Sequence, residues 1–163
     1  MAGYGSEAGF TAWLAENGHV LPAGAPTPAI LLQRGGQYVD NTYGSRFWGV
    51  PTLGIAQERA WPRTGAKAYG QTIPDDTIPA AVEQASYAAA HQEAIKPGSL
   101  SVSATATGAV KRKKIGSIEK EFFEGSGDVV ADGTLKLSTV EGLLAPYLKP
   151  ETTLASLGLW AVG

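Results

Sequence analysis

Residues 75–95 read DDTIPAAVEQASYAAAHQEAI, and they predict the best helix of the chain. Pro79 suits the first helical position, because the missing N–H costs nothing there and its φ is already helical. Asp75, Asp76 and Thr77 bring negative charge and a capping oxygen to the positive end of the helix dipole. Alanine has the highest helix propensity and lets a neighbouring backbone approach closely. We therefore expect a helix that packs tightly in a bundle or at a subunit contact.

The motif RAWPRTG, residues 59–65, precedes this helix. Pro62 biases Trp61 away from the α region, so the pair should form a rigid, extended aromatic anchor. The motif belongs to a connection over residues 45–77, which is longer than an ordinary loop in a compact domain. This connection is expected either to wrap the bundle or to contact a neighbouring molecule.

A first helix is predicted from about Glu7 to Asn17, with Ser6 as its N-cap and Gly18 just past its end. Large apolar residues recur along it at helical spacing and predict one buried face. That face consists of Phe10, Trp13 and Leu14, with Asn17 in line with them.

A second helix should start at Thr27-Pro28 and end at Gly44. Its mid-helix pair Gly35-Gly36 costs roughly 1 kcal/mol per glycine relative to alanine, which indicates close approach of another helix. The predicted buried stripe is Leu31, Leu32, Gly35, Val39 and Thr42.

The pattern changes after residue 99. Residues 100–107 alternate between apolar and hydroxyl side chains, which predicts a strand with one covered face. Gly108 makes a break, and residues 109–124 read as a second extended segment that Gly116 interrupts. Because two strands alone are marginal in water, we expect this ribbon to pair with, or lie against, another chain.

The C-terminal part carries a short helix and an apolar tail. Ser138-Thr139-Val140-Glu141 has the spacing of a capping box, and Pro146 should end the helix near Ala145. Residues 152–163 carry no charge, so this tail is expected to fold onto its own domain or to dock on a partner. The apolar face of the helix is Val140, Leu143, Leu144 and Leu148, and that of the tail is Leu154, Leu157, Leu159 and Trp160.

Composition excludes several classes of protein. The formal charge is −2, whereas binders of duplex DNA usually carry net positive charge. With no cysteine, the chain has neither disulfides nor thiolate metal sites. No apolar run reaches the roughly 18 residues that span a bilayer, and no signal peptide is visible, so we expect a soluble protein made in a cytoplasm.

Catalytic motifs are also missing. The spacing G-x-G-x-x-A at residues 3–8 does not follow a strand, so we reject a dinucleotide site there. There is no P-loop and no G-x-S-x-G elbow, and the two histidines, His19 and His91, fall short of the three protein ligands of a catalytic zinc. Asp75-Asp76 reads as helix-terminus charge, and the pair Glu119 and Glu121 as solvated or salt-bridged. We expect no enzyme, no metal and no cofactor.

One basic cluster leaves two interpretations open. It can contact phosphates or an acidic partner, or it can be a solvated face that discourages edge-to-edge aggregation. We favour the solvated face slightly, because Glu119, Glu121 and Glu124 follow closely and can neutralise it. Phe122 and Phe123 are the nearest aromatic residues for base stacking, although such residues are more often core. The cluster consists of Lys111, Arg112, Lys113 and Lys114.

Five motifs in order give the chain a resemblance to a known family. It resembles the small head–tail adaptor proteins of tailed phages, which are often labelled DnaT-like single-stranded-DNA-binding proteins. The likeness runs from about Phe10 to Lys149 and departs from the family at residues 45–60 and 150–163. The motifs are YVDNTYG at 38–44, WPRTG at 61–65, Ile78-Pro79 with the Ala-rich helix, KIGSI at 114–118 and LLAPYL at 143–148.

The resemblance implies a structural virion protein in the neck between capsid and tail, made in the bacterial host cytoplasm. Such adaptors form a ring, typically twelve-fold, beneath the portal protein, with packaged DNA passing through without sequence-specific binding. A tail terminator or stopper protein then binds the ring. We expect the ribbon to engage neighbouring subunits and residues 150–163 to dock on the portal. Residues assigned to portal or subunit contact are Trp61, Pro62, Arg63, Phe122, Phe123, Leu154, Leu157, Leu159 and Trp160.

The sequence therefore predicts an α+β, mainly α fold, with a small bundle of three to four helices, a β-ribbon arm and an extended C-terminal tail. Residues 1–98 should form the bundle, 99–125 the arm, 126–149 a loop and short helix, and 150–163 the tail. The competing function is that of a single-stranded-DNA-binding replication accessory protein. Net charge and the lack of an obvious base-stacking set weigh against it.

Overall fold

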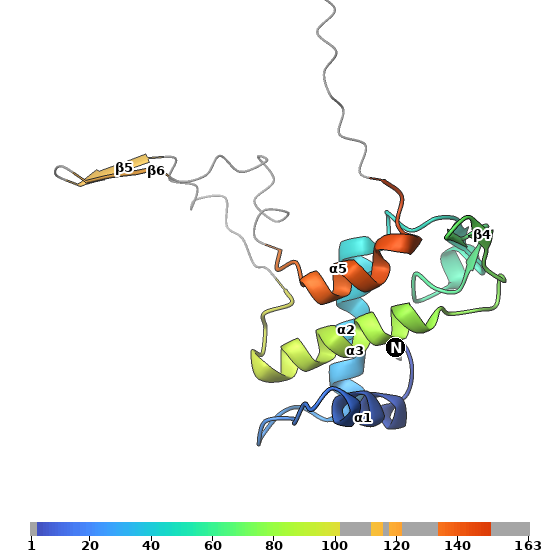
Figure 1. Ribbon diagram of the computed structural model, residues 1–163, viewed down its shortest axis with the longest axis horizontal. Helices are drawn as coiled ribbons and strands as arrows, with labels where there is room; N and C mark the ends of the chain where they lie inside the picture. Colours follow the sequence, from blue (N-terminus) through green and yellow to red (C-terminus); the bar gives the residue numbers. More distant parts are fainter. Residues whose placement is uncertain (1–2, 102–111, 116–117, 122–133, 151–163) are drawn as a thin grey trace, which may run out of the picture.

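A computed structural model describes residues 3–101, 112–115, 118–121 and 134–150 (Figure 1). Within these residues the chain forms four α-helices, two 3₁₀ turns and three antiparallel pairs of short strands. The α+β, mainly α fold predicted from the sequence is confirmed. Of the predicted tail at 150–163 only Pro150 is described, and residues 126–133 of the predicted loop lie outside the described residues.

The centre of the fold is the crossing of α2 (Pro28–Tyr43) and α3 (Ala80–Ile95). In Figure 1, α3 crosses α2 steeply, with α1 on one side of α3 and α5 on the other. Gly35 makes this contact close: a Cβ atom built on it would lie 2.3 Å from the carbonyl oxygen of Ser86. The expected close approach of another helix is confirmed at Gly35, whereas a Cβ atom on Gly36 would lie 3.3 Å from the Arg59 side chain and 3.4 Å from the Tyr4 backbone nitrogen.

Two details at the start of α3 differ from the sequence prediction. Pro79 is the N-cap and has extended backbone angles, so the first helical residue is Ala80. No side chain caps the helix, and Thr77 Oγ1 donates to the neighbouring carboxylate of Asp76 at 3.2 Å instead of to α3. The negative charge therefore lies before the helix without a direct capping bond.

The N-terminal helix α1 (Glu7–Glu16) has the predicted start, since the Ser6 side chain accepts the Gly9 N–H at 3.0 Å. Phe10 and Leu14 are buried against α2 and α3, and Gly18 has the positive φ of +66° that suits a residue just past a helix. The second helix likewise begins at Pro28 after Thr27. Its buried face is wider than predicted, because Tyr38 and Tyr43 are buried too.

The C-terminal helix α5 (Ser138–Leu144) packs on α3 and continues as the 3₁₀ turn η3 (Ala145–Tyr147). The predicted capping box is wrong: Leu137 is the N-cap, so Ser138 is already helical. The helix thus starts one residue earlier than predicted, and the Leu137 N–H donates to Tyr38 Oη at 3.3 Å. Val140 and Leu144 are fully buried, as the apolar spacing predicts.

Residues 45–77, which we call the loop lobe, wrap onto the bundle. Strand β1 (Val50–Pro51) pairs with β2 (Arg63–Thr64), and β3 (Lys67–Ala68) pairs with β4 (Gln71–Thr72). The 3₁₀ turn η1 (Gly54–Ala56) lies between β1 and β2. Phe47, Trp61 and Ala66 join the main core cluster with residues of α2, α3 and α5. Of the two alternatives for this connection, the structure bears out the one in which it wraps the bundle.

The ribbon is formed by β5 (Arg112–Ile115) and β6 (Ile118–Glu121), which pair antiparallel. Figure 1 shows it apart from the helices. The predicted ribbon ran from 100–107 through Gly108 to 109–124, and the pairing that the structure describes lies within the second of these segments. The two residues between the strands, Gly116-Ser117, are a typical hairpin turn sequence. Leu100 lies in a turn, and residues 102–111 lie outside the described part.

Candidate functional site

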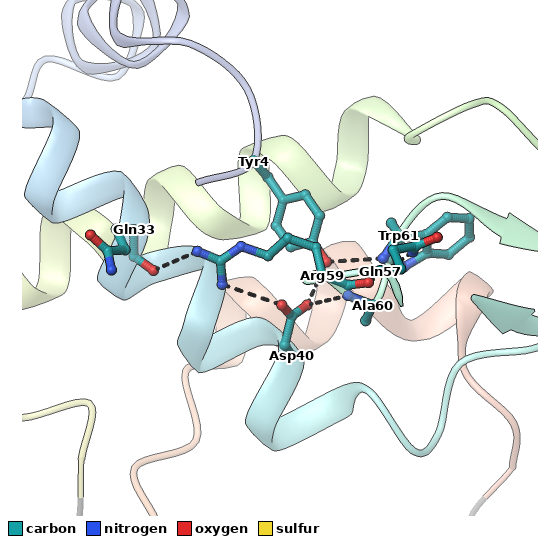
Figure 2. A network of polar contacts seen from close by, with 7 residues as sticks. All are labelled: Tyr4, Gln33, Asp40, Gln57, Arg59, Ala60 and Trp61. Carbon is teal, nitrogen blue, oxygen red and sulfur yellow. Dashed lines mark hydrogen bonds and ion pairs between the residues drawn. The ribbon is translucent and has the colours of Figure 1, made fainter. Parts of the chain in front are cut away.

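A buried polar network fixes the loop lobe to the bundle, and Asp40 of α2 is its centre (Figure 2). Asp40 Oδ1 accepts hydrogen bonds from Tyr4 Oη and from the Ala60 N–H, the latter at 3.2 Å. Arg59 Nη1 lies 3.3 Å from Asp40 Oδ2. One carboxylate therefore joins three parts of the chain: the segment before α1 that carries Tyr4, helix α2 and the loop lobe.

Further bonds extend this network on both sides. The Trp61 N–H donates to Tyr4 Oη at 3.1 Å, so the same hydroxyl both donates and accepts. Arg59 Nη2 donates to the Gln33 carbonyl at 3.2 Å, and Gln57 Nε2 donates to the Arg59 and Pro62 carbonyls at 2.8 and 2.9 Å. Figure 2 shows Arg59 lying along α2 between Gln33 and Asp40.

Burial dominates the electrostatics of the network. Desolvation raises the pKa of Asp40, and hydrogen bonds from Tyr4, Ala60 and Arg59 oppose that shift. Desolvation, with the Asp40 charge second, also raises the pKa of Tyr4, so this hydroxyl stays protonated and donates to the carboxylate. The partners of Asp40 are thus structural groups of the same chain, and the arrangement stabilises one position of the lobe.

The WPRTG motif is internal to the lobe. Trp61 is 2% exposed and packs edge-on against Phe47 and Tyr147, with ring centroids 5.4 and 6.2 Å away. The buried Arg63 guanidinium donates to three carbonyl oxygens: Nε to Trp48 at 2.8 Å, Nη1 to Ala60 at 3.0 Å and Nη2 to Gly49 at 2.7 Å. Trp61-Pro62 is a cis peptide.

The assignment of Trp61, Pro62 and Arg63 to portal or subunit contact stays a prediction. Because Trp61 and Arg63 are buried within their own chain, any effect on a partner passes through the lobe surface that they hold. Phe122, Phe123, Leu154, Leu157, Leu159 and Trp160 lie outside the described residues, and so does Lys111.

Five exposed apolar residues on the loop lobe were missed by the sequence reasoning. Among the described residues nine large apolar side chains are exposed, and five of them lie between residues 48 and 69. Ile55 is fully exposed, and Tyr69, at a φ of +52°, is 83% exposed. The only sequence signal was their presence in a Gly- and Pro-rich connection. We call this group the apolar set: Trp48, Val50, Leu53, Ile55 and Tyr69.

The described chain ends beside the start of the lobe. Phe47 and Leu148 form an antiparallel bridge, the Lys149 N–H donates to the Arg46 carbonyl at 2.7 Å, and the Trp48 N–H donates to the Tyr147 carbonyl at 3.3 Å. The chain therefore reaches Pro150 next to the lobe. The lobe and the point from which the C-terminal segment continues occupy the same side of the bundle.

The basic cluster lies partly on the ribbon, where the strand register decides its neighbours. Arg112 is the partner of Glu121 and Lys114 is the partner of Glu119, whereas Lys113 is the partner of Lys120. Opposite charges at directly paired positions favour a register, and like charges disfavour it. In the strand register, two of the three described basic positions thus lie opposite glutamate positions, and the interpretation of the cluster as a neutralised face stays a prediction.

The two histidines, far apart in sequence, stack with ring centroids 4.1 Å apart, and Trp13 packs beside both. Burial, and then the charge of His19, lower the pKa of His91. Among the residues that the structure describes, no group of three or more His, Asp or Glu side chains could hold a metal ion.

The family model described as "Putative DnaT-like ssDNA binding protein" matches residues 2–160, nearly the whole chain. The match spans the bundle, the loop lobe and the ribbon. No curated protein and no solved structure matches the chain. Within the described part of the chain, no helix is long and apolar enough to cross a membrane.

Proposed function

The chain belongs to the DnaT-like ssDNA binding protein family, and we propose that within this family it acts as a structural head–tail adaptor of a tailed phage. In this function it joins a ring, of about twelve subunits as in similar adaptors, between the portal protein and a tail terminator or stopper. It works in the neck of the virion around the exit channel for packaged DNA, and it catalyses no reaction.

The apolar set on the loop lobe is the observation that carries this proposal. Fully burying one such side chain stabilises a complex by about 1.5–3 kcal/mol, so five exposed ones favour association. The Asp40 network and the Arg63 bonds already hold the lobe in one shape. Binding a partner therefore costs little conformational entropy.

We assign the portal protein as the partner of the apolar set. The lobe adjoins Pro150, from which the uncharged segment 152–163 continues, so both apolar features start from one side of the bundle. We assign the ribbon to contact with the neighbouring subunit of the ring, because two strands alone are marginally stable. A contact of this kind is head-to-tail and closes into a ring by rotation.

Electron microscopy of the purified chain mixed with its cognate portal tests the proposal. Wild type should stack as a ring on the portal. The double variant Leu53→Ser/Ile55→Ser should lose that association, whereas Val20→Ser, which changes an exposed apolar residue outside the lobe, should keep it. Failure of wild type to associate, or equal association of all three proteins, would overturn the proposal.

A second function is favoured by the family description itself. The chain would then be an accessory protein of replication that binds single-stranded DNA. Such binding should weaken steeply with salt, because it releases counterions from the phosphates. Salt-sensitive binding of wild type to single-stranded DNA, together with no association with the portal, would favour this function over the adaptor.

A further inference from the structure

The tip of the β3–β4 hairpin in the loop lobe carries an exposed aromatic residue. Ala68 pairs with Gln71, so Tyr69 and Gly70 form a two-residue turn, and their φ angles are +52° and +79°. Within the described part of the chain, Tyr69 is the only residue other than glycine with a positive φ, and its side chain is 83% exposed. We propose that Tyr69 is an aromatic anchor that inserts into an apolar pocket of the portal protein. The inference deepens the adaptor function proposed above and rests on it.

The backbone of this turn is strained at Tyr69. Two-residue hairpin turns in which both central residues have positive φ favour Asn-Gly or Asp-Gly. A bulky side chain in the left-handed region raises the free energy of the folded chain, because its Cβ atom crowds the following carbonyl oxygen. Gly70 suits its position in the turn, and Tyr69 does not. Strained residues of this kind cluster at binding and catalytic sites, so the strain points to a use of the tyrosine outside the fold.

The exposed ring gives the fold little in return for that strain. Burial is what makes an aromatic side chain stabilising, and most of the Tyr69 side chain is in contact with solvent. The core tyrosines differ in this respect, since Tyr4, Tyr38 and Tyr43 are at most 3% exposed and belong to the main core cluster. A contact with another molecule would bury the Tyr69 ring and offset the strain.

The base of the hairpin is fixed to the core. The Ile73 N–H donates to the Ala66 carbonyl at 2.9 Å, Ala66 is fully buried, and Ile73 packs against the main core cluster. Figure 1 shows the hairpin, at the label β4, on the outer edge of the molecule. A fixed backbone thus presents Tyr69 to a partner. Tyrosine has only two rotatable side-chain angles, so ordering its ring on binding costs little entropy.

The hairpin adjoins the end of the described chain. Strand β3 contacts η3, from which the chain continues to Pro150, and the Trp48 N–H donates to the Tyr147 carbonyl in the same turn. This is the side of the bundle that the adaptor function assigns to the portal. Tyrosine is enriched among the few interface residues that carry most of the binding energy, and such residues fill pockets of the partner. Tyr69 should therefore account for a large share of the affinity for the portal.

Biolayer interferometry on the immobilised cognate portal, together with thermal unfolding followed by circular dichroism, tests the anchor. Tyr69→Asn removes the ring and gives the turn the Asn-Gly sequence that its geometry favours. Its melting temperature should rise by about 2–4 °C because the strain is relieved. Its affinity for the portal should fall by about tenfold or more.

Two further variants serve as controls. Tyr69→Phe keeps both the ring and the strain, and it should match wild type in melting temperature and in affinity. Ile95→Asn removes an exposed apolar side chain at the end of α3, outside the lobe, and it should bind the portal like wild type. Opposite changes in stability and affinity for Tyr69→Asn would exclude unfolding as the cause of weaker binding.

The outcomes separate the anchor from the adaptor function. If wild type does not bind the portal, the adaptor function and the anchor both fail. If wild type binds and Tyr69→Asn binds equally well, the anchor alone is overturned. The anchor is also overturned if Tyr69→Phe loses as much affinity as Tyr69→Asn, or if Tyr69→Asn fails to raise the melting temperature, since the tyrosine would then serve the fold.

Discussion

Gly35 of α2 faces the carbonyl oxygen of Ser86 in α3 so closely that a Cβ atom at position 35 would lie 2.3 Å from it. The same atom would lie 2.9 Å from the Ala90 backbone nitrogen. Because both neighbours are backbone atoms, a side chain could be accommodated only by separating the two helices. We expect Gly35→Ala to lower the free energy of unfolding by about 2 kcal/mol, although alanine is the better helix former. Urea unfolding followed by circular dichroism measures this difference.

Gly142→Ala is the matched control for that substitution. Gly142 lies inside α5, and a Cβ atom added there would meet nothing within 4 Å. The substitution should therefore raise the free energy of unfolding by about 0.5–1 kcal/mol through helix propensity alone. Effects of the same sign for both variants would contradict the steric explanation at Gly35.

The sequence was sufficient for the elements whose signals are local. Apolar spacing predicted the buried Phe10 and Leu14, and the Gly35-Gly36 pair predicted the close helix crossing. The strands of the loop lobe could not be predicted, because each is two residues long and has no periodicity to read. Of the predicted ribbon, only pairing within 109–124 falls on described residues, and the predicted strand at 100–107 lies almost wholly outside them.

The candidate site was harder to predict than the fold, because its parts are distant in sequence. The Asp40 network joins residues up to 57 positions apart, such as Tyr4 and Trp61. No spacing rule connects such residues. The WPRTG motif was assigned to partner contact, which stays a prediction, and the structure shows Trp61 and Arg63 buried inside the lobe. The exposed apolar set has only its composition as a signal.

Asp40→Ala should be among the most damaging substitutions in the polar network. It leaves Tyr4 Oη, the Ala60 N–H and Arg59 without their shared acceptor, so the free energy of unfolding should fall by about 3 kcal/mol. Asp40→Asn keeps one acceptor oxygen and should cost about half as much. Chemical denaturation of both variants gives the two values.

The exposed Asp75 provides the comparison, since Asp75→Ala should change stability by less than about 0.5 kcal/mol. The network would be irrelevant to stability if Asp40→Ala matched that control. An Asp40→Asn value equal to that of Asp40→Ala would show that the lost charge, and not the lost acceptor, causes the damage.

Arg63→Lys should loosen the lobe even though it conserves the charge. A single ammonium group cannot reach the Trp48, Gly49 and Ala60 carbonyls that the planar guanidinium reaches together. We expect a loss of about 2 kcal/mol and faster cleavage within residues 45–77 under limited proteolysis, read out by mass spectrometry. Arg34→Lys, at a half-exposed ion pair with Glu93, should cost less than about 1 kcal/mol and leave the cleavage pattern unchanged.

The histidine stack should make the free energy of unfolding fall as the pH falls. Burial and the charge of His19 lower the pKa of His91, so the folded state holds it neutral while the unfolded state takes up a proton near pH 6.5. Its stabilising contribution is thus complete above about pH 6.5 and is lost as pH falls through the lower folded-state pKa. Asp40 has the opposite effect on the pH dependence of stability because its pKa is raised, but wild type and His91→Gln both contain it, so its effect cancels from their comparison.

Urea unfolding from pH 8 to pH 5 should therefore show a flatter pH dependence for His91→Gln than for wild type. Parallel curves for the two proteins would mean that His91 titrates as it does in the unfolded chain and contributes nothing to acid sensitivity.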